Sequence, residues 1–159
     1  MESIRIFLDT DVLINWLARE VDPNTGKKLW EHPYRILKMI ESGKISGTTS
    51  LINLMEIIFV LRRKKKWKDE EIISKVGMIQ EMQNFAVLIP TEADIISAYN
   101  LQTVFKLDPF DSIYHAASRN RVDYIITRDS EFIEIVNSAE NRRFAMTPEE
   151  FLELVEQEE

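Results

Sequence analysis

The sequence predicts an α/β protein in which a parallel sheet is covered by helices on both faces. Short apolar segments rich in β-branched and aromatic residues alternate with longer segments in which apolar residues recur at helical spacing. Acidic residues directly follow two of the short segments, and in an open α/β sheet that position is the carboxyl edge, where ligands bind. With 159 residues, 45% of them hydrophobic and 30% charged, the chain is expected to form one domain over residues 1–159.

The elements are placed by apolar spacing and by residues that start or stop helices. The first strand is expected at residues 4–8, and a helix follows at once through Leu17. A polar loop with Pro23 and Gly26 precedes a helix over residues 29–41, which stops before Gly43. The remaining elements are predicted in this order: strand 45–48, a helix from the cap Ser50 to about Arg63, helix 69–84, strand 86–89, helix 91–105 with the cap Thr91, a helix from Asp108-Pro109 to about Asn120, strand 124–126, a short helix opened by Asp129, strand 143–145, and a helix from Thr147-Pro148.

Composition excludes several classes of site. The chain has no cysteine, which excludes disulfides, thiolate nucleophiles and the usual structural zinc sites. His32 and His115 are the only histidines, so a metal site must be built from oxygen ligands, which suit Mg²⁺ or Mn²⁺. No apolar run is long enough to span a bilayer and no signal-peptide pattern is present, so we expect a cytoplasmic protein with no membrane partner.

The charge is unevenly distributed along the chain. The formal net charge of −7 opposes nonspecific binding to nucleic acid, yet one short stretch is strongly basic. Such a segment can meet RNA phosphates, with Trp67 as a stacking or packing surface, or it can be a solvated helix end whose cations favour the C-terminal dipole. This basic segment consists of Arg62, Arg63, Lys64, Lys65, Lys66 and Lys68.

Two acids occupy equivalent places after buried strands. Asp9 follows the first strand, and Asp129 follows Ile125-Ile126-Thr127-Arg128 in the same way. Each has a simple structural explanation, because Asp9, Asp11 or Asp129 can cap the helix that comes next. The alternative is a metal or phosphate site at the carboxyl edge of the sheet.

Two further acids lie in helices that start from the same edge. Glu56 is the one acid inside a helix that is apolar on most of its girth, so the helix is expected to be buried and Glu56 to need a partner or a raised pKa. Its alternatives are an ion pair or access to solvent. Asp111 follows Asp108 by three residues and could complete a capping box, and His115 on the same helix face is expected to be a packed histidine. The carboxylates of Glu56 and Asp111 can converge with those of Asp9 and Asp129 on one cleft. Carboxylates packed together repel one another unless a divalent cation binds between them, so we expect such a cation there.

Four short motifs contain these acids. The first is Phe7-Leu8-Asp9-Thr10-Asp11-Val12-Leu13-Ile14, and the second is the serine–glutamate spacing from Ser50 to Glu56. The third is Asp111-Ser112-Ile113-Tyr114-His115-Ala116-Ala117, and the fourth is Thr127-Arg128-Asp129-Ser130-Glu131-Phe132. In this order the four motifs resemble those of the PIN-domain nucleases, the family of the VapC-type toxins. Asp11 departs from the pattern, because the family more often has asparagine or serine there.

The resemblance implies a compact three-layer α/β/α sandwich with a central parallel sheet and a metal-dependent endoribonuclease activity. It implies that Asp9, Glu56, Asp111 and Asp129 bind Mg²⁺ or Mn²⁺ and act in catalysis. Supporting roles fall to Thr10, Asp11, Thr127 and Arg128, with Arg128 contacting phosphate or pairing with the acids. The implied partners are an RNA substrate, an antitoxin protein if the chain is the toxin of a toxin–antitoxin pair, and a second copy in a homodimer.

Two other functions are compatible with parts of the sequence. Asp9-Thr10-Asp11-Val12 resembles the nucleophile motif of haloacid-dehalogenase-like phosphatases, although Glu56 would then have no role. A protein that keeps the PIN fold but serves as an RNA-binding partner or scaffold without cleavage is the other alternative.

Overall fold

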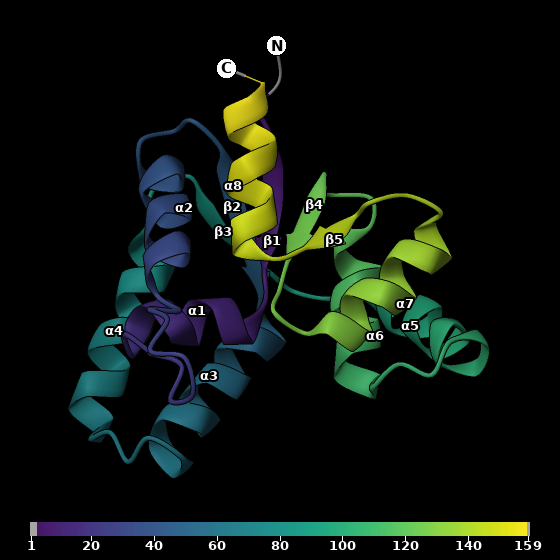
Figure 1. Ribbon diagram of the computed structural model, residues 1–159. Helices are drawn as coiled ribbons and strands as arrows, with labels where there is room; N and C mark the ends of the chain where they lie inside the picture. Colours follow the sequence, from purple (N-terminus) through teal and green to yellow (C-terminus); the bar gives the residue numbers. More distant parts are fainter. Residues whose placement is uncertain (1–2, 159) are drawn as a thin grey trace.

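A fully parallel five-stranded sheet lies at the centre of the computed structural model, which describes residues 3–158. The strand order is β3-β2-β1-β4-β5 (Figure 1). Every neighbouring pair is parallel, and a parallel sheet is what the sequence predicts. The strands are β1 (Arg5–Leu8), β2 (Ser46–Ser50), β3 (Phe85–Leu88), β4 (Tyr124–Ile126) and β5 (Ala145–Met146).

Helices connect the strands and cover both faces of the sheet. The group α1 to α4 lies on one side of the sheet in Figure 1, and α5, α6 and α7 lie on the other, so the predicted three-layer sandwich is confirmed. The helices are α1 (Thr10–Leu17), α2 (Glu31–Glu41), α3 (Leu51–Arg63), α4 (Asp69–Glu81), α5 (Glu92–Val104), α6 (Pro109–Ser118), α7 (Ser130–Glu140) and α8 (Pro148–Gln157).

The strand β1 supplies the core on both faces. Ile6 and Leu8 point into a cluster shared with α1 to α4 and with α8, while Phe7 points into a second cluster with α6 and α7. All three side chains are fully buried. This near-continuous apolar strand is typical of a parallel sheet that is covered on both faces.

The predicted helix starts follow from local capping. The Ser50 and Thr91 hydroxyls accept hydrogen bonds from the third backbone N–H of α3 and α5, and each helix has a complete capping box. Thr147 caps α8 in the same way, with Pro148 in the first turn. Gly43, at a φ of 81°, follows the end of α2 as the sequence predicts.

Some predicted boundaries are wrong. The second helix begins at Glu31 rather than Leu29, and Trp30 before it has no side-chain cap. The helix expected to reach Asn84 ends at Glu81, and the helix expected to reach Asn120 ends at Ser118. The last strand comprises Ala145 and Met146 instead of residues 143–145. These errors arise where no capping motif fixes the end of the element.

The expectation that the helix carrying Glu56 is buried on most of its girth is also wrong. The core-facing side of α3 is formed by Asn53, Leu54, Ile57 and Leu61. An apolar stripe of Leu51, Met55 and Phe59 is exposed instead, with 65% of Met55 accessible. Sequence shows that a helix is apolar, but the neighbouring elements decide which of its faces they cover.

Strands are added to the sheet first on one side of β1 and then on the other. The segments β2 and β3 extend the sheet on one side of β1, and β4 and β5 extend it on the other. The carboxyl ends of β1 and β4 therefore flank a topological switch point, where open α/β sheets bind their ligands. None of the helices within residues 3–158 is both long and apolar enough to span a membrane.

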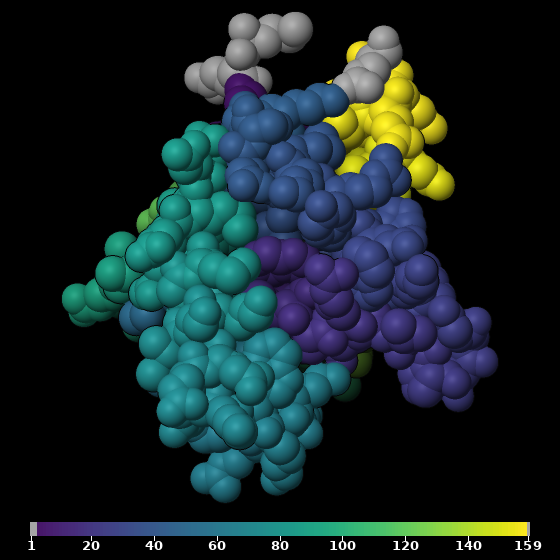
Figure 2. All heavy atoms as spheres, turned by 90° about the vertical axis from the view of Figure 1, so that its left-hand side faces the viewer, coloured from purple at the N-terminus to yellow at the C-terminus, as the bar shows by residue number. Residues whose placement is uncertain are grey.

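The helices α1, α2 and α4 form a face of the molecule away from this edge of the sheet. Figure 2 shows the face on which α1 lies between α2 and α4. A pocket opens on this face, lined in part by Trp16, Tyr34, Leu37 and Met78. It is separate from the edge of the sheet that carries Asp9 and Asp129.

Candidate functional site

The switch point places Asp9 between the ends of β1 and β4. Its Oδ1 accepts a hydrogen bond from the Thr10 N–H at 2.7 Å and caps α1, and its Oδ2 accepts one from the Thr127 hydroxyl at 2.7 Å. Burial raises the pKa of Asp9 well above its usual range, the charge of Asp11 adds to this, and the hydrogen bond from Thr127 opposes it. Asp9 therefore does cap α1, as one alternative from the sequence has it, but the cap uses only one of its two carboxylate oxygens.

Asp11 is held beside Asp9 by the backbone of the β4–α7 turn. Its Oδ2 accepts a hydrogen bond from the Arg128 N–H at 2.9 Å. Its Oδ1 is buried and has no hydrogen-bond partner within residues 3–158. Burial raises the pKa of Asp11 to about 6. Leaving a buried carboxylate oxygen without a hydrogen-bond donor is costly in free energy, so Asp11 Oδ1 stands apart from the other oxygens of this turn.

Glu56 reaches the same region from α3 and is half-buried. The Tyr114 hydroxyl on α6 donates a hydrogen bond to its Oε1. Burial raises the pKa of Glu56, while the hydrogen bond from Tyr114 opposes this rise. The ion-pair alternative does not hold, because the partner of Glu56 is the neutral phenol of Tyr114 rather than a cation. The solvent alternative holds in part, because Glu56 is half-buried and lines an open pocket.

Asp111 lies in the first turn of α6, and its carboxylate has no hydrogen bond among the described residues. The predicted capping box is absent, because the side chain of Asp108 caps α6 through the Phe110 N–H at 2.8 Å without Asp111. Burial raises the pKa of Asp111 to about 7, and the charges of Asp108, Asp129 and Glu56 add to it. This carboxylate is thus destabilised in its charged form by its neighbours.

Three of the four predicted acids line one open pocket of about 560 Å³: Glu56, Asp111 and Asp129. Asp129 caps α7 by accepting a hydrogen bond from the Phe132 N–H at 3.1 Å. Asp9 and Asp11 do not line this pocket, but both are close enough to Asp111 to influence charge in the group. As the side chains stand, no three acidic or histidine residues between 3 and 158 form a ready-made metal-binding group.

Asn53 and Tyr114 contact the acids although the sequence assigned neither of them a role. The buried Asn53 amide donates hydrogen bonds to Asp9 Oδ1 at 3.3 Å and to Thr10 Oγ1 at 2.9 Å. Its place three residues after the Ser50 cap was a usable signal, since a buried polar residue there has to be hydrogen-bonded. Tyr114 stacks on Phe7 with 6.1 Å between ring centroids, and it gives no such signal in the sequence.

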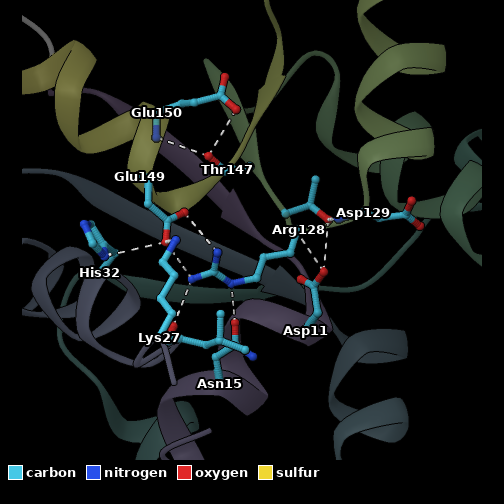
Figure 3. A network of polar contacts seen from close by, with 11 residues as sticks. Asp11, Asn15, Lys27, His32, Arg128, Asp129, Thr147, Glu149 and Glu150 are labelled. Carbon is cyan, nitrogen blue, oxygen red and sulfur yellow. Dashed lines mark hydrogen bonds and ion pairs between the residues drawn. The ribbon is translucent and has the colours of Figure 1, made fainter. Parts of the chain in front are cut away.

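Of the other predicted residues, Thr10, Thr127 and His115 lie as expected, and Arg128 does not. The Thr10 and Thr127 hydroxyls contact the acids or their partners, and His115 is a packed histidine whose Nε2 lies 2.7 Å from Glu140 Oε1, as expected. The Arg128 guanidinium does not pair with the site acids, because it is bound to Glu149 and other groups on the far side of the turn (Figure 3). These contacts contradict a direct ion pair between Arg128 and the site acids, although the Arg128 charge still acts to lower the pKa of Asp11.

The basic segment lies at the opposite end of α3 from Ser50 (Figure 1). Two of its members are already paired: Arg62 with Asp69 at 3.1 Å and Lys65 with Glu20 at 2.6 Å. Within residues 3–158, the side chains of the other four make no ion pair: Arg63, Lys64, Lys66 and Lys68.

Comparison with known proteins gives both a family and a fold. A family model described as the PIN domain matches residues 6–137. No protein in a search of curated sequences matches the chain.

Solved structures with the same fold have low sequence identity to the chain. A toxin–antitoxin complex from Klebsiella pneumoniae is 17% identical with a TM-score of 0.61, covering 90% of this chain and 97% of that one. VapBC2 from Rickettsia felis, bound to a DNA fragment from its promoter, is 14% identical with a TM-score of 0.64, covering 91% and 98%. VapC20 from Mycobacterium tuberculosis, a sarcin-ricin loop cleaving toxin, is 17% identical with a TM-score of 0.60, covering 80% and 92%.

Proposed function

The chain belongs to the PIN-domain family, and from this premise we propose that it is a metal-dependent endoribonuclease. The observation that carries the proposal is the group of carboxylates at the switch point, whose pKa values are raised by burial and by one another. Perturbed acids in a cleft at the carboxyl edge of a sheet are typical of a functional site. Membership of this family also sets aside the phosphatase alternative.

The residues present fit Mg²⁺ or Mn²⁺. All the donors are oxygens, they repel one another without a cation, and Asp11 Oδ1 is buried with no hydrogen-bond partner in the described part of the chain. We propose that Asp9, Glu56, Asp111 and Asp129 hold the ion. Such an ion supplies a bound water of lowered pKa and a positive charge that stabilises the phosphate oxygens during hydrolysis.

The surrounding residues orient these acids before RNA arrives. Thr127 and Asn53 fix the rotamer of Asp9 from two sides, and Tyr114 fixes Glu56. Preorganised ligands need less rearrangement when substrate binds. The pocket beside them is open and contains Lys106 and the half-exposed Phe110, so an RNA strand can approach the acids from solvent.

The direct test is cleavage of RNA by the purified protein with Mn²⁺, and again after the metal is removed with a chelator. Cleavage that needs the ion is the expected result. A protein that binds RNA but cleaves none at any Mn²⁺ concentration would support the alternative of a non-catalytic scaffold.

Tyr114→Phe is expected to shift the acidic limb of the pH–cleavage profile to higher pH by about one unit. The phenol stabilises the charged form of Glu56, so its loss raises the Glu56 pKa, and a hydrogen bond to a charged group is worth about 1.5–3 kcal/mol. Phenylalanine keeps the stacking on Phe7. Tyr124→Phe is the control, because Tyr124 begins β4 and so lies at the amino end of that strand. An equal shift in both variants would refute the role of Tyr114.

We propose that the unpaired members of the basic segment contact the RNA backbone. Changing Lys64 and Lys66 to Gln is expected to weaken RNA binding and to lower the slope of log affinity against log salt by about 0.7 for each charge removed. Turnover at saturating RNA should change little. Lys65→Gln is the matched control, because Lys65 is already paired with Glu20. An unchanged slope would mark the segment as a solvated helix end.

The similar structures suggest partners as well as a fold. Since the Klebsiella pneumoniae structure is a toxin–antitoxin complex, we propose that this chain is the toxin of such a pair, with an antitoxin protein as partner. We also propose a homodimer, in which the exposed α3 stripe of Leu51, Met55 and Phe59 would be covered. Co-expression with the product of the adjacent reading frame, followed by measurement of the mass of the purified species, tests both partners.

A further inference from the structure

The Arg128 side chain runs away from the acids and is bound from several directions. Its guanidinium donates two parallel hydrogen bonds to the Glu149 carboxylate, at 2.9 and 3.0 Å (Figure 3). A third hydrogen bond goes from Nη2 to the Leu29 carbonyl at 2.9 Å, and a fourth from Nε to Asn15 Oδ1. Only 18% of the Arg128 side chain is exposed, so this guanidinium is not free to meet a phosphate.

The same residue is joined to the acids through its backbone. The Arg128 N–H donates to Asp11 Oδ2 at 2.9 Å, and the adjacent Thr127 hydroxyl donates to Asp9 Oδ2 at 2.7 Å. The Asp129 N–H in turn donates to Thr127 Oγ1 at 3.2 Å. The three residues of this turn therefore set the position of Asp9, Asp11 and Asp129, while the Arg128 side chain fixes the turn from behind.

Glu149 is well suited to anchor this arginine. It lies in the first turn of α8, and its Oε1 is also 3.0 Å from Lys27 Nζ. Burial alone would raise the pKa of Glu149, but the hydrogen bonds from Arg128 and Lys27 lower it to about 2, so the pair stays charged at neutral pH. Glu149 also lies outside residues 6–137, the part that the PIN-domain model matches.

We propose that Arg128 and Glu149 are positioning residues, which lock the Thr127–Asp129 turn against α1 and α8 and thereby hold the acidic oxygens in the arrangement that binds the cation. This inference rests on the proposed function. It assigns part of the site to a residue from the C-terminal helix, and it gives Arg128 an indirect role in place of contact with phosphate. Loss of either partner loosens the turn. Without Glu149 the Arg128 guanidinium has lost its carboxylate, and without Arg128 the Glu149 carboxylate keeps the ion pair with Lys27 at its Oε1.

The test measures Mn²⁺ affinity without RNA for the wild type and for Arg128→Gln, Glu149→Gln and the double variant. Each single change is expected to weaken Mn²⁺ binding by about ten- to a hundredfold, which is the usual effect of losing a partner that orients a ligand. The double variant should be no worse than the more affected single variant, because the two residues act as one unit. Arg128→Lys keeps the charge but loses the paired hydrogen bonds, so it should recover little of the affinity.

Arg143→Gln is the matched control. Arg143 pairs with Glu150 at 2.7 Å, so it also binds the first turn of α8, but it has no hydrogen bond to the turn that carries the acids. Its loss should leave Mn²⁺ affinity unchanged. RNA affinity in the presence of a chelator is measured in parallel and should be unchanged in Arg128→Gln, whereas a phosphate contact would make it fall.

The outcomes separate this inference from the proposed function. Wild-type Mn²⁺ affinity in folded Arg128→Gln or Glu149→Gln overturns the inference alone and leaves a purely structural ion pair. A wild-type protein that binds no Mn²⁺ overturns both. If Arg128→Gln does not fold, Glu149→Gln and Arg128→Lys, which keep the arginine or its charge, still decide the question.

Discussion

Replacement of Asp9 by Asn is expected to abolish metal-dependent cleavage of RNA while leaving the fold intact. Asparagine caps helices as well as aspartate does, so it can keep the hydrogen bond to the Thr10 N–H that starts α1. It cannot supply the negative charge that a divalent cation needs. The rate of cleavage should fall by more than about a hundredfold. Even the loss of a residue that only hydrogen-bonds to a metal ligand typically lowers metal affinity or activity by about ten- to a hundredfold. Cleavage of a labelled RNA under saturating Mn²⁺ measures this.

This substitution distinguishes a cap from a cation ligand. If Asp9 only caps α1, the Asn variant should cleave RNA, bind Mn²⁺ and melt as the wild type does. Asp94→Asn is a suitable control, because Asp94 completes the capping box of α5 away from the pocket. Substantial cleavage by Asp9→Asn would refute the site as proposed.

The second large effect concerns pH and the stored repulsion among the acids. The metal-free protein is expected to lose stability as pH rises from about 4 to about 7. The pKa of Asp111 is raised to about 7 and that of Asp11 to about 6, so the folded protein binds more protons than the unfolded chain across this range. Stability must then fall with rising pH. Thermal melts of the metal-free protein between pH 5 and pH 8 measure the trend.

Mn²⁺ should reverse this loss at pH 8. A ligand that binds only the folded state adds about 2.7 kcal/mol at a hundredfold excess over its dissociation constant, which corresponds to a rise in Tm of about 5–10 °C for a chain of this length. Asp111→Asn removes one of the repelling charges. Without metal it should melt at or above the wild-type Tm at pH 8, and it should lose most of the shift that Mn²⁺ produces.

An alternative role for Asp111 predicts the opposite sign. If this carboxylate were a structural partner of the α6 terminus, the Asn variant would be less stable than the wild type without metal and would keep the full response to Mn²⁺. That pair of results would remove Asp111 from the site. Ser112→Ala in the same turn controls for loss of local structure, since the Ser112 hydroxyl donates to the Asp108 carbonyl at 2.8 Å.

Local sequence alone determined the order of the elements and the edge of the sheet on which the proposed site lies. Helix caps act over three residues, so Ser50, Thr91 and Thr147 could be recognised without knowledge of their surroundings. The apolar run before Asp9 and the one before Asp129 identified strands whose carboxyl ends share an edge. Parallel strands bring such ends together by geometry, which is why sequence alone predicted that these two acids lie at the same edge.

Only the tertiary structure decided which groups surround the acids of the proposed site. Tyr114 meets Glu56 across 58 positions, and Arg128 meets Glu149 across 21, so neither contact leaves a periodic signal in the sequence. The exposed Leu51, Met55 and Phe59 stripe shows the same limit, because spacing tells that a face is apolar and not what covers it. Capping and strand patterns are set by short-range backbone geometry, whereas these partnerships depend on how separate elements pack against one another.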